Sequence, residues 1–256
     1  MPAFLDYDKF QASLSGMVLP TCAVIKGKFK FVGTSFLCAY AGHMVIINAG
    51  HTVKDADAGG YELATRLPNG ETHSLLTCNT KFIDNGKMDV AISVRPLEEA
   101  KTILDKGASL FDLCSAYHSN LPKFGRLIFT GYPASRYKPN ANTPRAEFVS
   151  YTIESVHPPY CKDIAYKIDE EYHIVGRRTP PKEKVSRTDA NGAGTRVDLP
   201  KLAGMSGGPV FWYDPEIGAR PYFAGIGISD LGKKGYVVAL KAEAMIAALN
   251  DYFKEK

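Results

Sequence analysis

Short runs of apolar and β-branched residues, separated by Gly, Pro and charged positions, follow one another along most of the chain. Such runs bounded by turn residues are typical of β-strands, and many of them at short spacing indicate an all-β sandwich or barrel. The expected strands occupy 18–25, 30–39, 43–49, 62–67, 75–82, 90–94, 126–130, 147–156, 209–212, 222–229 and 235–240. Their number favours two β lobes.

Near the C-terminus the apolar spacing changes from that of a strand to that of a helix. Apolar residues recur at i, i+1, i+4, i+7 and i+8 within 241–253, at Met245, Ile246, Leu249, Tyr252 and Phe253. This spacing puts them on one side of an α-helix, which we expect to pack on a lobe. We therefore predict a C-terminal helix at 241–254, and a shorter helical segment at 98–106 between the two halves.

The predicted organisation is a single domain, 1–256, with an N-terminal lobe at about 18–100 and a C-terminal lobe at about 121–240. Between 131 and 204 the apolar pattern is weak, because prolines and charged residues interrupt it. Within 176–191 basic residues outnumber acidic ones. We interpret part of this stretch as an exposed loop, with a lid or a docking surface for an acidic partner as the alternative.

Composition and charge restrict the class of protein without naming a partner. The chain is 45% hydrophobic and 23% charged, which is ordinary for a globular protein. The net charge of +4 is too small to indicate nucleic-acid binding, and no apolar run approaches the roughly 20 residues of a membrane helix. Asp6 and Asp8 stand where a secretory signal carries basic residues. We expect no nucleic-acid partner, no membrane contact, and a cytoplasmic rather than secreted protein.

The cysteines show no pattern of a metal or disulfide site. The five cysteines lie far apart, without a CxxC pair or a Cys–His cluster at zinc spacing, at Cys22, Cys38, Cys78, Cys114 and Cys161. They are interpreted as scattered thiols in a reducing compartment. We expect no metal and no cofactor, and a thiol enzyme that pairs a cysteine with a histidine has no supporting motif.

The segment LAGMSGGPV places Ser206 among glycines, where the backbone can turn sharply and N–H groups can converge. Residues 204–208 also satisfy the GxSxG nucleophile motif of α/β-hydrolases. In that fold the catalytic histidine follows the serine along the chain, whereas all six histidines here precede Ser206. The order of residues and the strand-rich pattern therefore exclude an α/β-hydrolase.

Two upstream motifs complete a different arrangement. NAGH at 48–51 ends one strand-like run, DVA at 89–91 begins another, and GMSGGP follows at 204–209. In this order the three motifs resemble those of the trypsin/chymotrypsin-like serine proteases, which look like TAGH or TAAH, D-[IV]-A and GxSGGP. The resemblance extends over about 30–240, since GTSF before the histidine and GIGIS after the serine also look like strands of that family.

The resemblance implies two packed six-stranded antiparallel β-barrels with a C-terminal α-helix and an active site between the barrels. It implies His51, Asp89 and Ser206 as the catalytic residues, and the backbone N–H groups of Gly204 and Ser206 as the oxyanion hole. The expected function is that of a serine endopeptidase, which hydrolyses a protein or peptide substrate through an acyl-enzyme intermediate.

The resemblance also suggests which residues contact the substrate. Pro200 falls at the floor of the specificity pocket, where trypsin has an acidic residue, so cleavage after Arg or Lys is not expected. Ile228, Ser229 and Asp230 correspond to the strand that pairs with the substrate backbone. Lys201 and Asp230 carry opposite charges, which leaves the specificity open.

Two features of the digestive enzymes are missing from this chain. Thr52 follows His51, so the disulfide that brackets the catalytic histidine is absent, which favours a bacterial-type or intracellular member. Met205 stands in place of the aspartate that pairs with the N-terminal amine after zymogen cleavage. The alternative function is therefore a latent or regulated protease-fold binding or signalling module that needs an activating protein partner.

Overall fold

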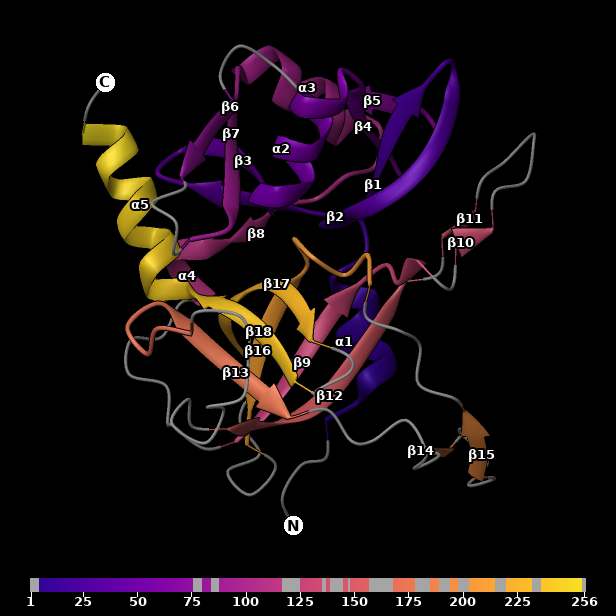
Figure 1. Cartoon of the computed structure of the whole chain (residues 1–256), viewed down its shortest axis with the longest axis vertical. Helices are drawn as coiled ribbons and strands as arrows, with labels where there is room; N and C mark the ends of the chain where they lie inside the picture. The colour runs from indigo at the N-terminus through magenta and orange to yellow at the C-terminus, as the bar shows by residue number, and fades with distance from the viewer. Residues whose placement is uncertain are drawn as a thin grey trace.

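Two curled antiparallel β-sheets form most of the molecule, and a C-terminal helix lies alongside both of them (Figure 1). The computed structural model describes residues 5–75, 80–83, 88–116, 125–134, 137–138, 145–146, 148–156, 168–177, 185–188, 194–197, 203–214, 220–231 and 236–254. The expected all-β class with two β lobes and a C-terminal helix is confirmed. This pair of sheets is compatible with a chymotrypsin-like double barrel.

The first sheet is built from the N-terminal half of the chain. Its strands are β1 (Val18–Ile25), β2 (Lys28–Tyr40), β3 (His43–Ala49), β4 (Glu62–Arg66), β5 (Thr72–Ser74), β6 (Thr80–Ile83), β7 (Val90–Arg95) and β8 (Phe111–Asp112). They follow the order β5-β4-β1-β2-β3-β7-β6, and β8 pairs in parallel with β2. Leu37, Ile46 and Leu63 are fully buried in its core.

The second sheet closes into a six-stranded barrel, as expected. Its strands are β9 (Arg126–Gly131), β12 (Val149–Val156), β13 (His173–Arg177), β16 (Pro209–Tyr213), β17 (Tyr222–Leu231) and β18 (Tyr236–Lys241). They close in the order β12-β13-β18-β17-β16-β9. Phe129, Val210 and Trp212 belong to one of its buried apolar clusters.

The first sheet differs from the expected six-stranded barrel. It has eight strands, and no pairing between its end strands β5 and β6 is found in the described part of the chain. The predicted strand 75–82 overlaps only β6, which begins at Thr80, while β5 ends at Ser74, before the predicted strand starts. Residues 76–79 lie outside the described residues. The apolar run was therefore a poor guide to where strand pairing stops.

Several elements have no counterpart in the predicted pattern. They are the strands β5, β8 and β13, of which β13 is needed to close the barrel, and the helices α1 (Tyr7–Ser13), α2 (Gly50–Gly59) and α4 (Leu113–Ala116). The two-stranded sheets β10 (Tyr137–Lys138) with β11 (Arg145–Ala146) and β14 (Val185–Thr188) with β15 (Gly194–Val197) were also not predicted. The predicted loop 176–191 begins in β13 and includes β14, while 178–184 and 189–191 lie outside the described residues.

The helices α3 (Leu97–Asp105) and α5 (Ala242–Lys254) match the two predicted helical segments closely. Met245 and Leu249 of α5 are fully buried, as the apolar spacing predicts. The C-terminal end of α5 reaches the first sheet, where Asn250 accepts a 2.7 Å hydrogen bond from Tyr40 and Phe253 stacks on the His43 ring. The helix therefore connects the barrel to the first sheet (Figure 1).

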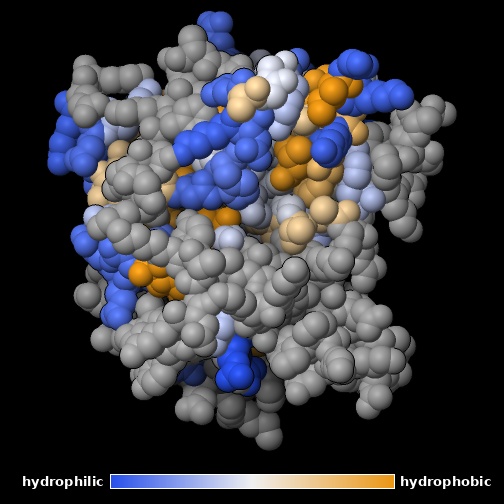
Figure 2. Space-filling view, in the orientation of Figure 1, coloured by the Kyte–Doolittle hydropathy of each residue, from blue (hydrophilic) through white to orange (hydrophobic). Residues whose placement is uncertain are grey.

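On the face shown in Figure 2, hydrophobic and hydrophilic side chains lie close together over the half that holds the first sheet. Ile25 and Phe29 are 39% and 38% exposed, and they flank the turn of the β1–β2 hairpin next to Lys26 and Lys28.

Among the described helices, none combines the length and the apolarity needed to cross a bilayer.

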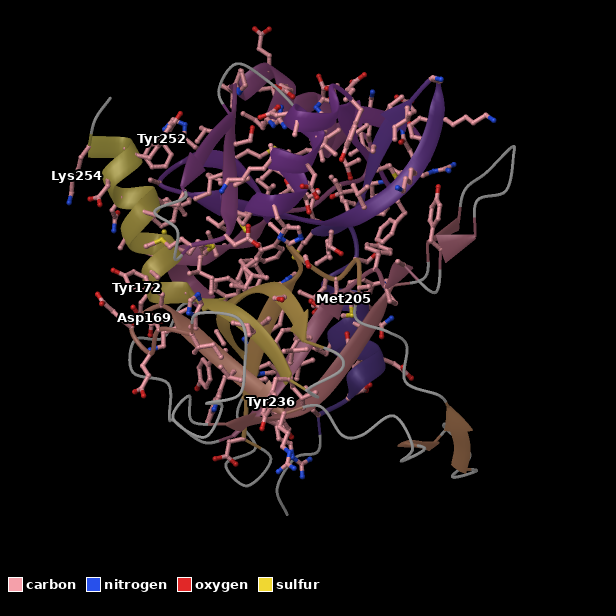
Figure 3. The ribbon with its side chains drawn as sticks, viewed as in Figure 1. Asp169, Tyr172, Met205, Tyr236, Tyr252 and Lys254 are labelled. Atoms are coloured by element: carbon pink, nitrogen blue, oxygen red, sulfur yellow. The ribbon has the colours of Figure 1, made fainter. Side chains whose placement is uncertain are left out.

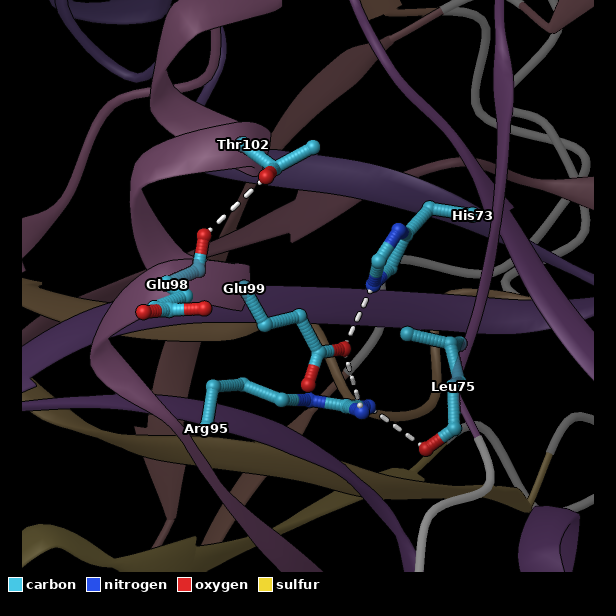
Figure 4. Close-up of polar contacts among 6 residues, drawn as sticks. All are labelled: His73, Leu75, Arg95, Glu98, Glu99 and Thr102. Carbon is cyan, nitrogen blue, oxygen red and sulfur yellow. Dashed lines mark hydrogen bonds and ion pairs between the residues drawn. The ribbon is translucent and has the colours of Figure 1, made fainter.

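A buried charge cluster holds the first sheet to α3 (Figure 4). The Arg95 side chain, at the end of β7, is fully buried and donates hydrogen bonds to Glu99 Oε1 at 2.9 Å and to the Leu75 carbonyl at 2.5 Å. His73 Nε2 lies 2.7 Å from the same Glu99 oxygen. The Glu99 carboxylate is thus the counter-charge of a buried guanidinium.

We expect Glu99→Ala to lower the free energy of unfolding by about 3 kcal/mol, because it leaves the Arg95 charge buried without a partner. Glu98→Ala removes the same charge from an exposed position of the same helix and should change stability by less than about 0.5 kcal/mol. Urea denaturation of both variants tests the difference, and equal effects would contradict a buried ion pair that stabilises the fold.

Candidate active site

The pairing of β3 with β7 brings His51 and Asp89 together. These antiparallel strands align Ala49 with Val90, so β3 ends beside the beginning of β7. Helix α2 begins directly after Ala49, and Gly50 N–H donates a 3.0 Å hydrogen bond to the Asp89 carbonyl. His51, in the first turn of α2, is therefore held next to Asp89 by the register of the sheet.

Both oxygens of the Asp89 carboxylate are used by His51. Oδ1 accepts the His51 backbone N–H at 2.6 Å, and Oδ2 makes a short hydrogen bond with Nδ1 of the ring. A carboxylate that faces the N-terminus of a helix is also favoured by the helix dipole. A Cβ atom on Gly50 would lie 2.9 Å from Asp89 Oδ1, so glycine allows this close approach.

The environment of His51 suits a general base. The hydrogen bond with Asp89 raises the pKa of His51, and desolvation opposes this with a smaller effect. The side chain is 45% exposed, whereas that of Asp89 is 21% exposed. Because Nδ1–H of the neutral ring donates to Asp89, Nε2 has a free lone pair with which to accept a proton.

Ser206 lies in a turn that contacts both sheets. The Ser206 carbonyl accepts a 2.9 Å hydrogen bond from Thr34 N–H of β2, and Gly207 N–H donates a 2.8 Å bond to the Gly227 carbonyl of β17. Met205 is 4% exposed and packs in the barrel core, and Figure 3 shows it between the two sheets. An apolar side chain therefore anchors the turn at this position.

The Ser206 turn packs against the segment that carries His51. A Cβ atom on Gly33 would lie 3.3 Å from both Ser206 O and Thr52 Oγ1. The described residues include no hydrogen bond between His51 and Ser206, and Ser206 Oγ lies 3.5 Å from the Ile228 carbonyl. Catalytic hydrogen bonds are often long before substrate binds, so this arrangement is compatible with proton transfer.

Two peptide groups in the turn are oriented by their carbonyls. Ala203 O accepts the Ala134 N–H at 2.7 Å, and Met205 O accepts the Gly208 N–H at 2.9 Å. In a planar trans peptide the following N–H points away from the carbonyl. The N–H groups of Gly204 and Ser206 therefore point away from these bonds, and within the described chain neither donates to a protein acceptor. Free, fixed donors are what an oxyanion hole requires.

The candidate substrate strand is part of β17. Pairing between β16 and β17 reaches Ile226, and a register shift follows between Gly227 and Ser229. From Ile228 onward one edge of β17 has no strand partner among the described residues, which suits the addition of a peptide strand. Ile228 as a whole is 1% exposed, whereas Ser229 is half-buried, so Ser229 is the more accessible residue of this edge.

Not every predicted contact can be located. Asp230 belongs to β17, but its side chain and the whole of Pro200 lie outside what the structure describes. Their roles in specificity stay predictions. In the described ranges, no group of three or more His, Cys, Asp or Glu side chains could hold a metal ion.

Two buried polar residues support the site and were not singled out individually from the sequence. Thr34 Oγ1 donates to the Gly204 carbonyl at 2.9 Å and accepts the Tyr132 N–H at 3.1 Å. Asn48 Nδ2 donates to the Thr34 carbonyl at 3.2 Å and to Ser35 Oγ at 2.7 Å. A polar residue within an apolar run was the available signal, because buried polar groups are normally hydrogen bonded.

Comparison with protein-family models and with curated proteins gives no match to this chain. The geometry of the His51, Asp89 and Ser206 region therefore carries the assignment of a function.

We expect His51 to titrate above its ordinary pKa of about 6.5 in the folded protein, and Asp89→Asn to lower this value by removing the charged acceptor. The exposed Asp55 acts on His51 only through space, so Asp55→Asn should lower it less. NMR titration of the His51 ring measures both changes. An equal response to the two substitutions would contradict the Asp89 hydrogen bond as the main cause.

The raised pKa of His51 also leads us to expect a pH dependence of the stability. The pair stabilises the fold fully below the pKa of unfolded histidine, and this contribution is lost as pH rises through the folded His51 pKa. The difference in unfolding free energy between the native chain and Asp89→Asn should therefore shrink as pH rises across that range. Urea denaturation at a series of pH values gives the comparison, and a difference that grows with pH would have the wrong sign.

We expect Gly207→Ala to disrupt the turn, because a Cβ at this position would lie 2.0 Å from the Thr34 carbonyl. Gly42 also has a positive φ, +78° against +91° for Gly207, but a Cβ there meets no atom within 4 Å. Gly42→Ala should cost about 1 kcal/mol from backbone strain alone, and Gly207→Ala about 3 kcal/mol. Denaturation midpoints of the two variants test whether close packing on Thr34 adds to the strain.

Proposed function

We propose that the chain is a serine endopeptidase in which Ser206 is the nucleophile, His51 the general base and Asp89 the residue that orients His51. The observation that carries this proposal is the double contact of the Asp89 carboxylate with His51 beside the turn that holds Ser206. The ordered NAGH, DVA and GMSGGP motifs supply independent support from the sequence.

The proposed reaction uses each of these groups in turn. His51 Nε2 takes the Ser206 hydroxyl proton while Oγ attacks the substrate carbonyl carbon, and the imidazolium is stabilised by Asp89. His51 then gives this proton to the amine nitrogen as the peptide bond breaks, which leaves an acyl-enzyme. Water, deprotonated by His51, hydrolyses that ester and restores Ser206.

The oxyanion of each tetrahedral intermediate would be bound by the N–H groups of Gly204 and Ser206. The loss of one such donor typically raises the barrier by roughly 3 kcal/mol. The edge of β17 that has no strand partner among the described residues from Ile228 onward supports an extended protein or peptide as the substrate, since main-chain hydrogen bonds can align it past Ser206.

A second candidate is a latent protease-fold module that becomes active on binding a partner protein. It is favoured by one observation, namely that Ser206 Oγ faces the Ile228 carbonyl and is not hydrogen bonded to His51 in the described structure. A partner that moves the turn by a small distance would then complete the site. Covalent labelling separates the two candidates, because it needs no knowledge of the substrate.

We expect a fluorophosphonate probe to label the native chain at Ser206. Labelling should be lost in Ser206→Ala and slowed by roughly 10³-fold or more in His51→Ala. Ser13→Ala and His43→Ala remove the same functional groups from exposed positions of the chain and should label at the native rate. Absence of labelling in the native chain would favour the latent module, and persistent labelling of Ser206→Ala would contradict Ser206 as the nucleophile.

A further inference from the structure

The Gly204 residue of the candidate oxyanion turn is enclosed on several sides. Its φ is +93°, and a Cβ atom there would lie 2.4 Å from Phe31 Cε1, 2.9 Å from Ala134 N and 3.0 Å from Tyr132 O. The Phe31 ring and the backbone of 132–134 thus pack directly on Gly204. A side chain at this position would push one of these neighbours away.

The backbone of 132–134 also sets the direction of the Gly204 N–H. The Ala134 N–H binds the Ala203 carbonyl at 2.7 Å, which fixes the plane of the peptide group between Ala203 and Gly204. If this peptide rotated by half a turn, the carbonyl would lose that bond and the Gly204 N–H would point toward Ala134. The orientation of this donor therefore depends on where 132–134 lies.

Tyr137 packs on Phe31, the aromatic neighbour of Gly204. It is the first residue of β10, and its ring stacks on Phe31 with centroids 5.4 Å apart and planes at 25°. The hydroxyl is buried beside the Cys22 thiol, and burial raises the pKa of Tyr137. The contact with the turn is thus made by the ring and not by the hydroxyl.

We propose that Tyr137 is a positioning residue for the Gly204 N–H. Its ring keeps Phe31 closed on Gly204, so the docking of Tyr137 on Phe31 determines whether this amide faces the reacting carbonyl. This inference rests on the proposed protease function and extends it to a residue that the sequence motifs did not include.

The effect should be confined to one of the two oxyanion donors. The Ser206 N–H is oriented by a different bond, from Gly208 N–H to Met205 O, and His51 is held by Asp89. Neither of these contacts involves Tyr137. Loss of the Tyr137 ring should therefore change the Gly204 amide while the Ser206 amide and the pKa of His51 stay as they are.

The test compares Tyr137→Ala with Tyr137→Phe, which keeps the ring, and with Tyr222→Ala. Tyr222 of β17 is a matched control because, like Tyr137, it is half-buried and packs on an aromatic ring. Its partner is Trp212 of β16, and the ring centroids are 6.2 Å apart. We expect Tyr137→Ala to slow fluorophosphonate labelling roughly 10- to 100-fold, and the other two variants to label near the native rate. The ¹H–¹⁵N signal of Gly204 should move in Tyr137→Ala alone.

The amide signal decides the proposal whether or not the chain is an active protease. If the native chain is not labelled, the proposed function fails. A Gly204 amide shift that is present in Tyr137→Ala and absent from Tyr137→Phe still supports the positioning role. An unchanged Gly204 amide in Tyr137→Ala overturns the positioning role whatever the labelling rate. If Tyr137→Ala does not fold, Tyr137→Leu, which keeps apolar volume without a ring, takes its place under the same criteria.

Discussion

A single threonine joins the two sheets where the candidate site is built. Thr34 donates its backbone N–H to the Ser206 carbonyl, and its hydroxyl connects Tyr132 N–H to the Gly204 carbonyl. The residue is completely buried, so these bonds do not compete with water, and a broken one would leave a buried polar group unsatisfied. The position of the nucleophile turn relative to the first sheet depends on this contact.

The two parts of the site are assembled by different means. His51 and Asp89 are neighbours because β3 and β7 pair in one register, which is a local property of the first sheet. Ser206 reaches them through packing between the sheets, at Thr34, along α5 and in the apolar cluster where Phe36 contacts Phe223. The distance between His51 and Ser206 is therefore the quantity most sensitive to how the sheets lie against each other.

Much of this arrangement could be predicted, for identifiable reasons. Apolar runs located β3, β7 and β16, and motif order singled out His51, Asp89 and Ser206. Helix α2 was not predicted because the residues on its buried side, Gly50, Thr52, Val53 and Ala56, do not form a run of apolar residues at helical spacing. The hydrogen bond from Ala134 N–H to Ala203 O could not be predicted, because every residue other than proline carries the same backbone groups and the two segments are far apart in the sequence. Fold class was therefore accessible from the pattern, and the support of the turn was not.

Closure of the barrel has a consequence for the growing polypeptide. β18, which ends at Lys241, must pair with both β13 and β17 before the barrel is complete, and β17 supports the Ser206 turn through Gly227. During synthesis the N-terminal part of a chain generally folds first. A nascent chain would therefore hold His51 and Asp89 in a formed sheet while Ser206 still lacks its support, so the ribosome-bound protein carries no complete site.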